Sequence, residues 1–330
     1  MNLLLAADIG ASKTDLGIFS LKEPAPSPLF QDRLINNNFS RPEELLAQFI
    51  STSGYQPSLA CLAIAGLIGD GQTEMTNRHW QLDGQKLTAT LGLSHIKLIN
   101  DLTALSASLL HLHADNLITL QKGMPIAHSQ QQIRAVIAPG TGLGQGFFID
   151  APPFSLAQGT EGGHASFAPC NDLQYRLLRW LQHKDLPISV EQVCSGRSLP
   201  TLYQFCLTQG ATTNSALQQE IKQSTDQTPL IIQGALTTCP CCRQAVELFL
   251  EILGAEAGNL ALKLACNHGL FLGGGILPRL HGQISFAPLL AAFQNKAKMS
   301  NYLKSIPVHL IMKQDAALMG AAVWARQHLQ

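Results

Sequence analysis

The sequence predicts an α/β protein whose 330 residues suffice for two lobes, each with its own core. Twice, an apolar run of strand length leads into a glycine-rich turn and then into a second apolar run. Between these two patterns, a short apolar run delivers Asn100 and Asp101 to the start of a segment with helical spacing. A carboxylate where a strand passes into a helix lies at the edge of a cleft in many α/β sheets.

The first pattern begins with the apolar run Leu3 to Ala7, which predicts a buried strand. Asp8 and Gly10 follow in a tight turn, where backbone N–H groups can approach phosphate oxygens closely. Ser12 and Thr14 add hydroxyl donors, and the Asp8 carboxylate could partner a phosphate-bound Mg²⁺. The segment also has the pattern of an ordinary β-hairpin, and the two interpretations are compatible.

The second pattern runs from a strand at 135–138, through the turn Pro139 to Gly146, into a strand at 147–149. Glycine at every second residue would weaken an ordinary strand, so these glycines indicate a turn whose backbone is left without side chains for the close approach of a ligand. The spacing does not fit G-x-G-x-x-G before a helix, and no G-x-x-x-x-G-K-[ST] occurs. We therefore predict two hairpins that face one phosphate chain, rather than a dinucleotide fold or a P-loop.

Between the two patterns, 96–99 predicts a short strand, and leucines at helical spacing predict a helix over 103–112. Asp101 stands at their junction. It is either a functional carboxylate at a cleft edge or a simple cap of the helix, and residue preference alone leaves both open.

Two further helices are predicted. The segment 243–267 carries an apolar face, and its Gly254 and Gly258 indicate close packing against a neighbour, because glutamates interrupt any membrane-spanning pattern. The last predicted helix is 316–328.

Together, the motifs of the chain resemble those of the bacterial glucokinases of the hexokinase and actin superfamily. The resemblance covers essentially the whole sequence, and the order of the motifs makes it specific. The motifs are Asp8-x-Gly10, Ile99-Asn100-Asp101, Gly140-Thr141-Gly142-Leu143-Gly144, Glu161-Gly162-Gly163-His164 and Gly273-Gly274-Gly275-Ile276, with Met75-Thr76-Asn77 and Trp80, Phe167-Ala168-Pro169, Glu191-Gln192-Val193 and Asn259-Leu260-Ala261-Leu262 between them.

The resemblance implies a two-lobed actin-like or hexokinase-like fold of the ribonuclease H-like type, with the active-site cleft between the lobes. The small α/β lobe would comprise 1–111 plus 314–330, and the large α+β lobe 112–313. The implied activity is ATP-dependent phosphorylation of D-glucose to D-glucose 6-phosphate, the first step of glycolysis. The implied assembly is a homodimer.

The resemblance also assigns roles to residues. Asp101 would be the general base that accepts the proton of the sugar's 6-hydroxyl, and the cofactors would be ATP and Mg²⁺, with Asp8 holding the metal directly or through water. Taken singly, His164 could be a structural histidine, and Glu161 or Glu191 a solvated acid. The implied glucose ligands are Asn100, Asp101, Glu161, His164 and Glu191, and the implied ATP contacts are Ala7, Asp8, Ile9, Gly10, Ala11, Ser12, Gly140, Thr141, Gly142 and Gly274.

The chain departs from the family pattern at the first turn. Ala11 stands where a second glycine is usual, and Ser12 where threonine is usual, so the hydroxyl is kept and one methyl group is added. The zinc-binding cysteine motif of the wider repressor and sugar-kinase family is absent. The cluster Cys239-Pro240-Cys241-Cys242 lacks the spacing of zinc ligands, which predicts incidental thiols at a helix start, with a redox-sensitive surface as the alternative.

Composition limits the partners. The chain has 22 basic and 22 acidic residues, so we expect no net positive electrostatic potential that would attract nucleic acid or an acidic membrane surface. No apolar run is long enough to span a bilayer, and Met1 to Ala7 lacks the charged region of a signal peptide, so we expect a cytoplasmic protein. Two alternatives are also enzymes, a kinase for another hexose and a kinase that uses polyphosphate. A third belongs to another class, a non-catalytic sugar-binding regulator.

Overall fold

The structure is a computed structural model that describes residues 3–23, 27–66, 68–75, 80–124, 131–182, 187–237 and 239–329. Thr76 and Asn77 of the motif quoted above lie outside these ranges. By its internal contacts the chain divides into two compact units, which we describe separately. Unit 1 comprises Met1–Asn116, Gly146–Gly159 and Lys313–Gln330, and unit 2 comprises Leu117–Gln145 and Thr160–Met312. The lobe boundaries expected from the sequence differ chiefly in having placed 146–159 in the larger lobe.

Unit 1 is built on a five-stranded sheet of order β3-β2-β1-β4-β7. Strands β1, β4 and β7 are parallel, whereas β2 pairs antiparallel with both β1 and β3. A separate antiparallel pair is formed by β5 and β6. The strands are β1 (Leu3–Ile9), β2 (Lys13–Ser20), β3 (Pro28–Ile35), β4 (Leu59–Ile64), β5 (Gln72–Met75), β6 (Trp80–Asp83) and β7 (His95–Asn100).

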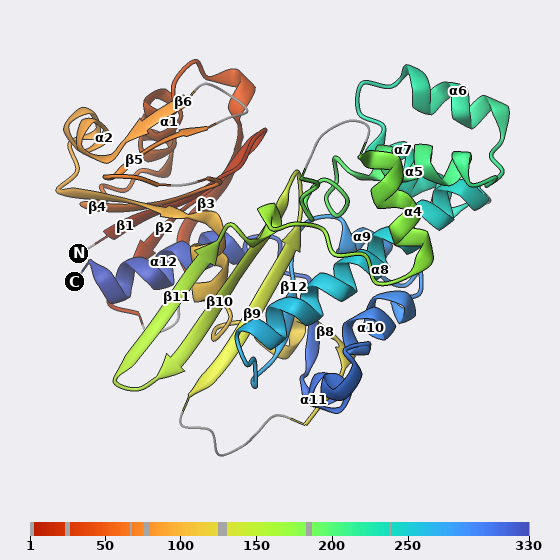
Figure 1. Cartoon of the computed structure of the whole chain (residues 1–330). Helices are drawn as coiled ribbons and strands as arrows, with labels where there is room; N and C mark the ends of the chain where they lie inside the picture. Colours follow the sequence, from red (N-terminus) through yellow and green to blue (C-terminus); the bar gives the residue numbers. More distant parts are fainter. Residues whose placement is uncertain are drawn as a thin grey trace. The chain divides into compact units, whose positions relative to one another are not determined.

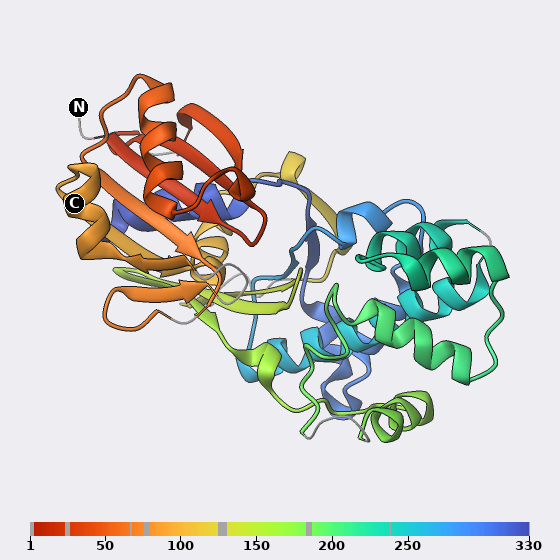
Figure 2. The same ribbon diagram turned by 90° about the horizontal axis from the view of Figure 1, so that it is seen from above.

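Helices cover both faces of this sheet. Successive side chains of β1 point to opposite faces, and those on each face are apolar and pack against helices. Leu3 and Leu5 belong to one apolar cluster with residues of α1 (Pro42–Ser53) and α2 (Gly84–Leu91). Leu4 and Ala6 belong to another with residues of α12 (Ala316–His328), which also packs on α3 (Asp101–Ser108). In Figures 1 and 2 the blue helix α12 runs along the red strands accordingly.

The second sheet has six strands in the order β11-β10-β9-β12-β13-β8. Strands β9, β12 and β13 are parallel, and β8 pairs antiparallel with β13. Residues 146–159 of β10 and β11 count with unit 1. The strands are β8 (Leu117–Gln121), β9 (Gln132–Pro139), β10 (Leu143–Ala151), β11 (Phe154–Thr160), β12 (Leu270–Leu272) and β13 (Val308–Ile311).

Helices α5, α7 and α10 pack on α8 (Pro240–Lys263), whose apolar side chains belong to the largest core cluster. Figure 1 shows α5 and α7 near one end of α8 and α10 near its middle. The other helices of this unit are α4 (Asp172–Leu181), α5 (Leu199–Thr208), α6 (Ser215–Gln223), α7 (Thr228–Leu236), α9 (Leu277–Leu280), α10 (Ala287–Gln294) and α11 (Ser300–Ser305).

The expected α/β class and the final helix 316–328 are confirmed, while two helix boundaries differ from the expectation. Helix α8 spans 240–263 instead of 243–267, because Cys239 caps its start. Helix α3 spans 101–108 instead of 103–112, because Asn100 caps its start and the last residues tighten into a turn in which His111 N donates to Ser108 O. In both cases a side-chain hydrogen bond to the first turn decides where the helix begins.

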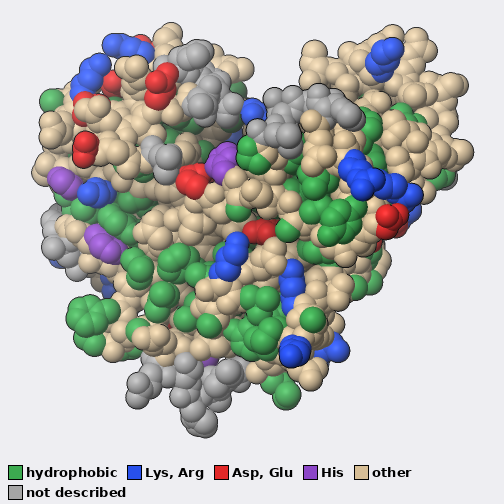
Figure 3. All heavy atoms as spheres, viewed as in Figure 1, with side chains coloured by type: hydrophobic (Ala, Val, Ile, Leu, Met, Phe, Trp, Pro, Cys, Tyr) green, Lys and Arg blue, Asp and Glu red, His purple; other side chains and the backbone are tan. Residues whose placement is uncertain are grey.

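Charges of both signs are interspersed over the face drawn in Figure 3, which agrees with the balanced composition. None of the helices in the described parts of the chain combines the length and the apolar character that crossing a membrane requires.

Close packing at the glycines of α8 is confirmed. A Cβ on Gly254 would lie 2.0 Å from the backbone oxygen of Leu289 in α10, and one on Gly258 would lie 2.8 Å from the backbone oxygen of Phe293. These glycines let the two helices approach backbone to backbone.

Gly254→Ala should therefore destabilise unit 2, because an added methyl group forces α8 and α10 apart. We expect a loss of roughly 1 to 3 kcal/mol in the free energy of unfolding, measured by urea denaturation. Gly69→Ala is the control, since a Cβ there meets no atom within 4 Å. Equal stability of the two variants would contradict the packing argument.

Candidate active site

The turn between β1 and β2 is held by Asn36, a buried residue for which the sequence gave no functional expectation. Asn36 Nδ2 donates to the backbone oxygen of Gly10 at 2.8 Å, and Asn36 N donates to the backbone oxygen of Ser12 at 3.0 Å. The hydroxyl of Thr14 donates to Asn36 Oδ1 at 2.7 Å, so Thr14 supports the turn and is buried rather than free to meet a ligand. We call Asp8–Ser12 the first glycine turn. The run of three asparagines at 36–38 was the only signal in the sequence.

The small residues Gly10 and Ala11 fit this turn because little space is available there, and neither has a left-handed backbone φ. Gly10 N donates to Lys13 O at 3.0 Å, and a Cβ on Gly10 would lie 3.1 Å from that same oxygen. The backbone φ of Ala11 is not in the left-handed region. Alanine therefore fits where the family usually has glycine. Ala7 and Ile9 are buried, so of the expected nucleotide contacts these two offer only backbone atoms.

Asp8 and Asp101 lie at the same edge of the five-stranded sheet. Strand register pairs Asp8 with Ala63 of β4, and Ala63 with Ile99 of β7. Parallel strands end on one side of a sheet, so the end of β1 and the start of α3 lie close together. The two carboxylates are near enough for the negative charge of Asp101 to act on Asp8.

The cap of α3 is Asn100, not Asp101. Asn100 Oδ1 accepts hydrogen bonds from the backbone N–H groups of Leu102 and Thr103, at 2.9 and 3.2 Å, and its Nδ2 donates to the backbone oxygen of Gly66. Asp101 is the first residue of the helix, and its Oδ1 accepts from Leu102 N at 2.9 Å. The N-cap position therefore belongs to Asn100, while the carboxylate of Asp101 shares the N–H of Leu102 with it.

Burial and repulsion raise the pKa of Asp8 from 3.8 to about 7. Burial is the largest cause, followed by the negative charges of Asp101 and Asp15, and Lys13 and Arg33 offset only part of the effect. Asp15 is itself held by Arg33, whose Nη2 donates to its carboxylate at 3.2 Å. A divalent cation relieves this kind of repulsion, and Mg²⁺ typically takes one or two carboxylates together with water and phosphate oxygens. Asp8 and Asp101 fit that donor set.

The turn between β9 and β10, Gly140–Gly142, is the second glycine turn. Gly140 N donates to Gly142 O at 2.8 Å, and Gly196 N donates to Gly140 O at 2.7 Å. Gly274 lies against the same place: its φ is +82°, and a Cβ there would lie 2.2 Å from the backbone oxygen of Pro139. Unit 2 thus brings together the expected nucleotide contacts Gly140, Gly142 and Gly274, with Thr141 exposed between the first two.

Unit 2 also brings together Glu161, His164 and Glu191, which we call the sugar residues. His164 stands in the short 3₁₀ turn Gly162–His164, with its Nε2 3.7 Å from a carboxylate oxygen of Glu161. Glu191 N donates to Gly163 O at 2.9 Å, and Glu191 Oε2 accepts from Leu143 N at 2.8 Å. One oxygen of Glu191 therefore holds the end of the second glycine turn and the other remains for a ligand.

The cysteine cluster has a different role from either of those expected. Cys239 Sγ accepts from Cys242 N at 3.4 Å and caps α8, while Cys241 and Cys242 are fully buried. The redox-sensitive surface is therefore wrong for these three thiols. Within the described ranges, no three His, Cys, Asp or Glu side chains gather where they could hold a metal ion. That the thiols are dispensable for activity stays a prediction.

Comparison with known proteins identifies the family of the chain. A family model described as Glucokinase matches residues 5–328. The glucokinase of a Nostoc species is 35% identical over 344 aligned residues, covering 98% of this chain and 99% of that protein. The crystal structure of a glucokinase from an Antarctic psychrotroph has a TM-score of 0.84 at 27% identity, covering 99% of both chains. A ROK family glucokinase from Streptomyces griseus, solved with glucose and AMPPNP, has a TM-score of 0.64 at 18% identity over 98% of this chain and 99% of that one, a likeness of fold alone.

The fold is that of the sugar kinases of the actin-like ATPase class. Within that class, the family model and the sequence identity to the relatives show which family the chain belongs to. The chain belongs to the glucokinase family.

Asp8→Asn should remove a pH-dependent loss of stability. Because the pKa of Asp8 is raised from 3.8 to about 7, the folded state binds this proton more tightly than the unfolded state does. The free energy of unfolding of the wild type therefore falls as the pH rises between these values, and then levels off. Lacking this fall, the variant should gain roughly 2 to 4 kcal/mol relative to the wild type between about pH 4 and pH 8.

Urea unfolding at a series of pH values, without divalent cations, measures this difference. Asp32→Asn is the matched control, because Asp32 is exposed on β3 of the same sheet. If wild type and Asp8→Asn have parallel stability curves, the carboxyl of Asp8 is not held in the environment described here.

Proposed function

We propose that this chain transfers the γ-phosphoryl group of ATP to the 6-hydroxyl of D-glucose, producing glucose 6-phosphate. The observation that carries the proposal is the match to the glucokinase family over nearly the whole chain, together with a carboxylate at the strand-to-helix junction where the family pattern has its base. Phosphoryl transfer asks the protein mainly to position the reactants and to stabilise charge.

Asp101 is the proposed general base. It stands in the first turn of α3, where the positive end of the helix dipole favours the carboxylate form that accepts a proton. The cap of that helix is provided by Asn100, so Asp101 is not needed for capping. A base that acts late, on a hydroxyl that is already becoming acidic, needs little intrinsic basicity.

The sugar residues Glu161, His164 and Glu191, with Asn100 and Asp101 of unit 1, are the proposed glucose ligands. A hexose presents a ring of hydroxyls that both donate and accept, which acids, an amide and an imidazole can match. The exposure of Glu161 and His164 and the second carboxylate oxygen of Glu191 support this assignment, since all three offer polar atoms to a ligand.

The proposed ATP contacts are the first glycine turn, the second glycine turn and Gly274. Their bare backbones let N–H groups approach phosphate oxygens. The solved relative with glucose and AMPPNP supports ATP as the donor. When bound, Mg²⁺ neutralises charge on the phosphates, and Asp8 would hold it directly or through water.

Three further parts of the proposal rest on the family resemblance. They are the homodimer, the cytoplasmic location and the lobes of 1–111 plus 314–330 and of 112–313. Within the described ranges the cysteines are all free, and only Cys170 is exposed, which suits a reducing compartment.

A coupled assay with glucose, Mg²⁺ and ATP tests the activity directly. Competition with mannose, amino sugars and polyphosphate identifies the sugar and the phosphoryl donor. Turnover of another hexose at a higher kcat/KM than glucose would replace the proposed substrate, and sugar binding without turnover would indicate a regulator.

Asp101→Asn should lower kcat by at least on the order of a hundredfold, because the proton of the attacking hydroxyl loses its acceptor. Glucose binding, measured by calorimetry without nucleotide, should be largely retained. Asp115→Asn is the control, since Asp115 is an exposed acid of the same unit. Turnover of Asp101→Asn near the wild-type value would remove Asp101 from the proposed role.

Glu191→Gln should raise the KM for glucose roughly 5- to 150-fold, equivalent to about 1 to 3 kcal/mol. The amide oxygen can still accept from Leu143 N, but an NH₂ group then replaces the oxygen left for the sugar. Glu220→Gln, on the exposed face of α6, is the control. An unchanged KM and kcat would move the sugar contact elsewhere.

A further inference from the structure

A network of four polar side chains runs through unit 2, with Gln145 and Glu256 buried and Asn259 and Lys296 half-buried. Lys296 Nζ donates to Asn259 Oδ1 at 2.6 Å, and Asn259 Nδ2 donates to Glu256 Oε2 at 2.9 Å. Gln145 Nε2 donates to the other oxygen, Glu256 Oε1, at 3.0 Å. Gln145 is 2% exposed and Glu256 is 6% exposed, so both side chains are almost fully covered by the protein. The steps derived above use none of the four.

The direction of every hydrogen bond in this network is fixed by its charged members. Lysine can only donate and a carboxylate can only accept. Asn259 must therefore turn its oxygen to Lys296 and its NH₂ group to Glu256, and Gln145 must turn its NH₂ group to Glu256 as well. The oxygen Oε1 of Gln145 is consequently directed away from Glu256. The burial of Lys296 lowers its pKa, but the network holds its ammonium group at one end.

That directed oxygen supports the segment that carries two of the sugar residues. A Cβ on Gly162 would lie 2.2 Å from Gln145 Oε1, so the oxygen lies against the backbone between Glu161 and Gly163. The hydroxyl of Thr160 donates to the backbone oxygen of Gln145 at 3.4 Å and accepts from Gly162 N at 3.2 Å. Gln145 thus contacts this segment through both its side chain and its backbone.

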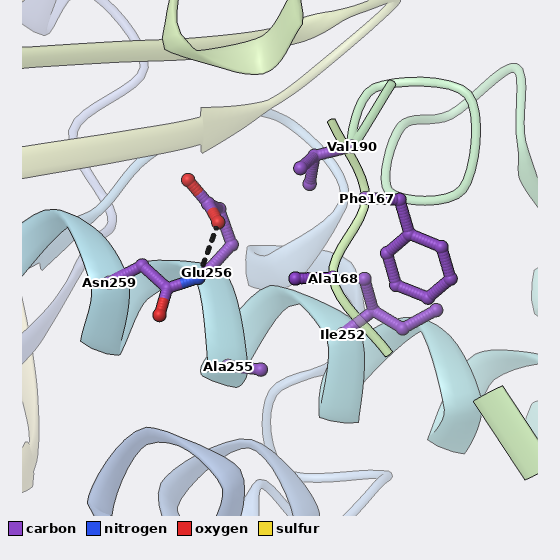
Figure 4. Close-up of a pocket in the computed structure, with 7 residues that line it drawn as sticks. All are labelled: Phe167, Ala168, Val190, Ile252, Ala255, Glu256 and Asn259. Atoms are coloured by element: carbon purple, nitrogen blue, oxygen red, sulfur yellow. Dashed lines mark hydrogen bonds between the residues drawn. The ribbon is translucent and has the colours of Figure 1, made fainter. Parts of the chain in front are cut away.

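The third sugar residue is linked to the same place. Figure 4 shows a small pocket in which Glu256 and Asn259 of α8 face Phe167 and Val190. Phe167 follows shortly after His164, and Val190 directly precedes Glu191. The dashed line in Figure 4 is the bond from Asn259 to Glu256. Glu256 therefore lines one pocket together with a residue from each of the two segments that carry sugar residues.

Stability alone is a weak reason to bury this carboxylate. A buried ionised group loses its hydration, and well-packed apolar side chains often stabilise such a position as well or better. A buried carboxylate with two directed donors does fix geometry, which is what the nearby sugar residues require.

The glycine Gly258 makes room for the network, because a Cβ there would lie 2.7 Å from the Lys296 side chain.

We propose that Glu256 is a positioning residue of the sugar site, which orients Gln145 so that its amide oxygen supports Gly162 and sets the positions of Glu161 and His164. The inference rests on the proposed function, because it takes these residues as glucose ligands.

Glu256→Gln tests the proposal with little change in volume. An amide accepts at one atom only, so either Gln145 or Asn259 then faces another NH₂ group. The KM for glucose, and the glucose Kd measured by calorimetry without nucleotide, should rise about tenfold. The KM for ATP should stay within about twofold of the wild type. Glu247→Gln is the control, because Glu247 is a half-exposed acid on the same helix.

A swapped double variant, Gln145→Glu with Glu256→Gln, provides the rescue. The new amide at 256 accepts from Asn259 and donates to the new carboxylate at 145, which again turns an oxygen toward Gly162. Glucose affinity should return to within about threefold of the wild type. If Glu256→Gln does not fold, Gln145→Met carries the same test, because it removes the supporting oxygen and leaves α8 unchanged, and glucose affinity should again fall about tenfold.

Three results would overturn the proposal. One is a lower Tm with unchanged glucose KM and Kd in both Glu256→Gln and Gln145→Met, which would make the network structural only. Another is an equal rise in the KM values for glucose and ATP. The third is a swapped variant that restores the Tm but not glucose affinity. Failure of the wild type to phosphorylate glucose would instead overturn the proposed function, so the two failures are distinguishable.

Discussion

The parallel pairing of β1, β4 and β7 is the constraint that brings Asp8 and Asp101 to one edge of the sheet in unit 1. Because these strands run the same way, their ends meet at one edge, and the register brings Asp8 level with Ile99 through Ala63. Two carboxylates from distant parts of the sequence are thereby brought close enough for one to raise the pKa of the other. This repulsion opposes folding. An unfavourable pair of carboxylates at the end of an otherwise apolar sheet is typical of a functional site, because it does not stabilise the fold.

In unit 2, the corresponding constraint is steric. The second glycine turn, the sugar residues and the segment at Gly274 approach one another so closely that side chains are excluded. A Cβ on Gly142 would collide with the carboxylate of Glu191, and one on Gly163 would lie 2.2 Å from the backbone oxygen of Leu143. A single carboxylate, Glu191, can therefore contact both the turn and a ligand. A displacement of the turn would be passed directly to the sugar residues.

The sequence indicated the strands and the last helix well, and the residues it proposed for the site stay predictions. Apolar runs next to glycine-rich turns located β1 and β9, because buried strands and glycine-rich turns differ strongly in composition. Helix starts were less predictable, since Asn100 and Cys239 cap helices through hydrogen bonds that depend on local geometry. The supporting residues could not be predicted at all. Asn36, Gln145 and Glu256 act by contacts with residues distant in sequence. Apart from the asparagines that follow Asn36, nothing in their neighbours distinguishes them from ordinary polar positions.

The sequence by itself determined the class of chemistry, because short motifs carry the groups that phosphate and sugar require: bare glycine turns, a carboxylate after a strand, and acids beside a histidine. Only the tertiary structure decided how those groups are held. Burial of a polar side chain forces it to find partners, and the partners that Asn36, Glu191 and Glu256 find come from other elements of the fold. A motif can specify which atoms are present, but the direction in which they point depends on contacts that exist only once the chain has folded.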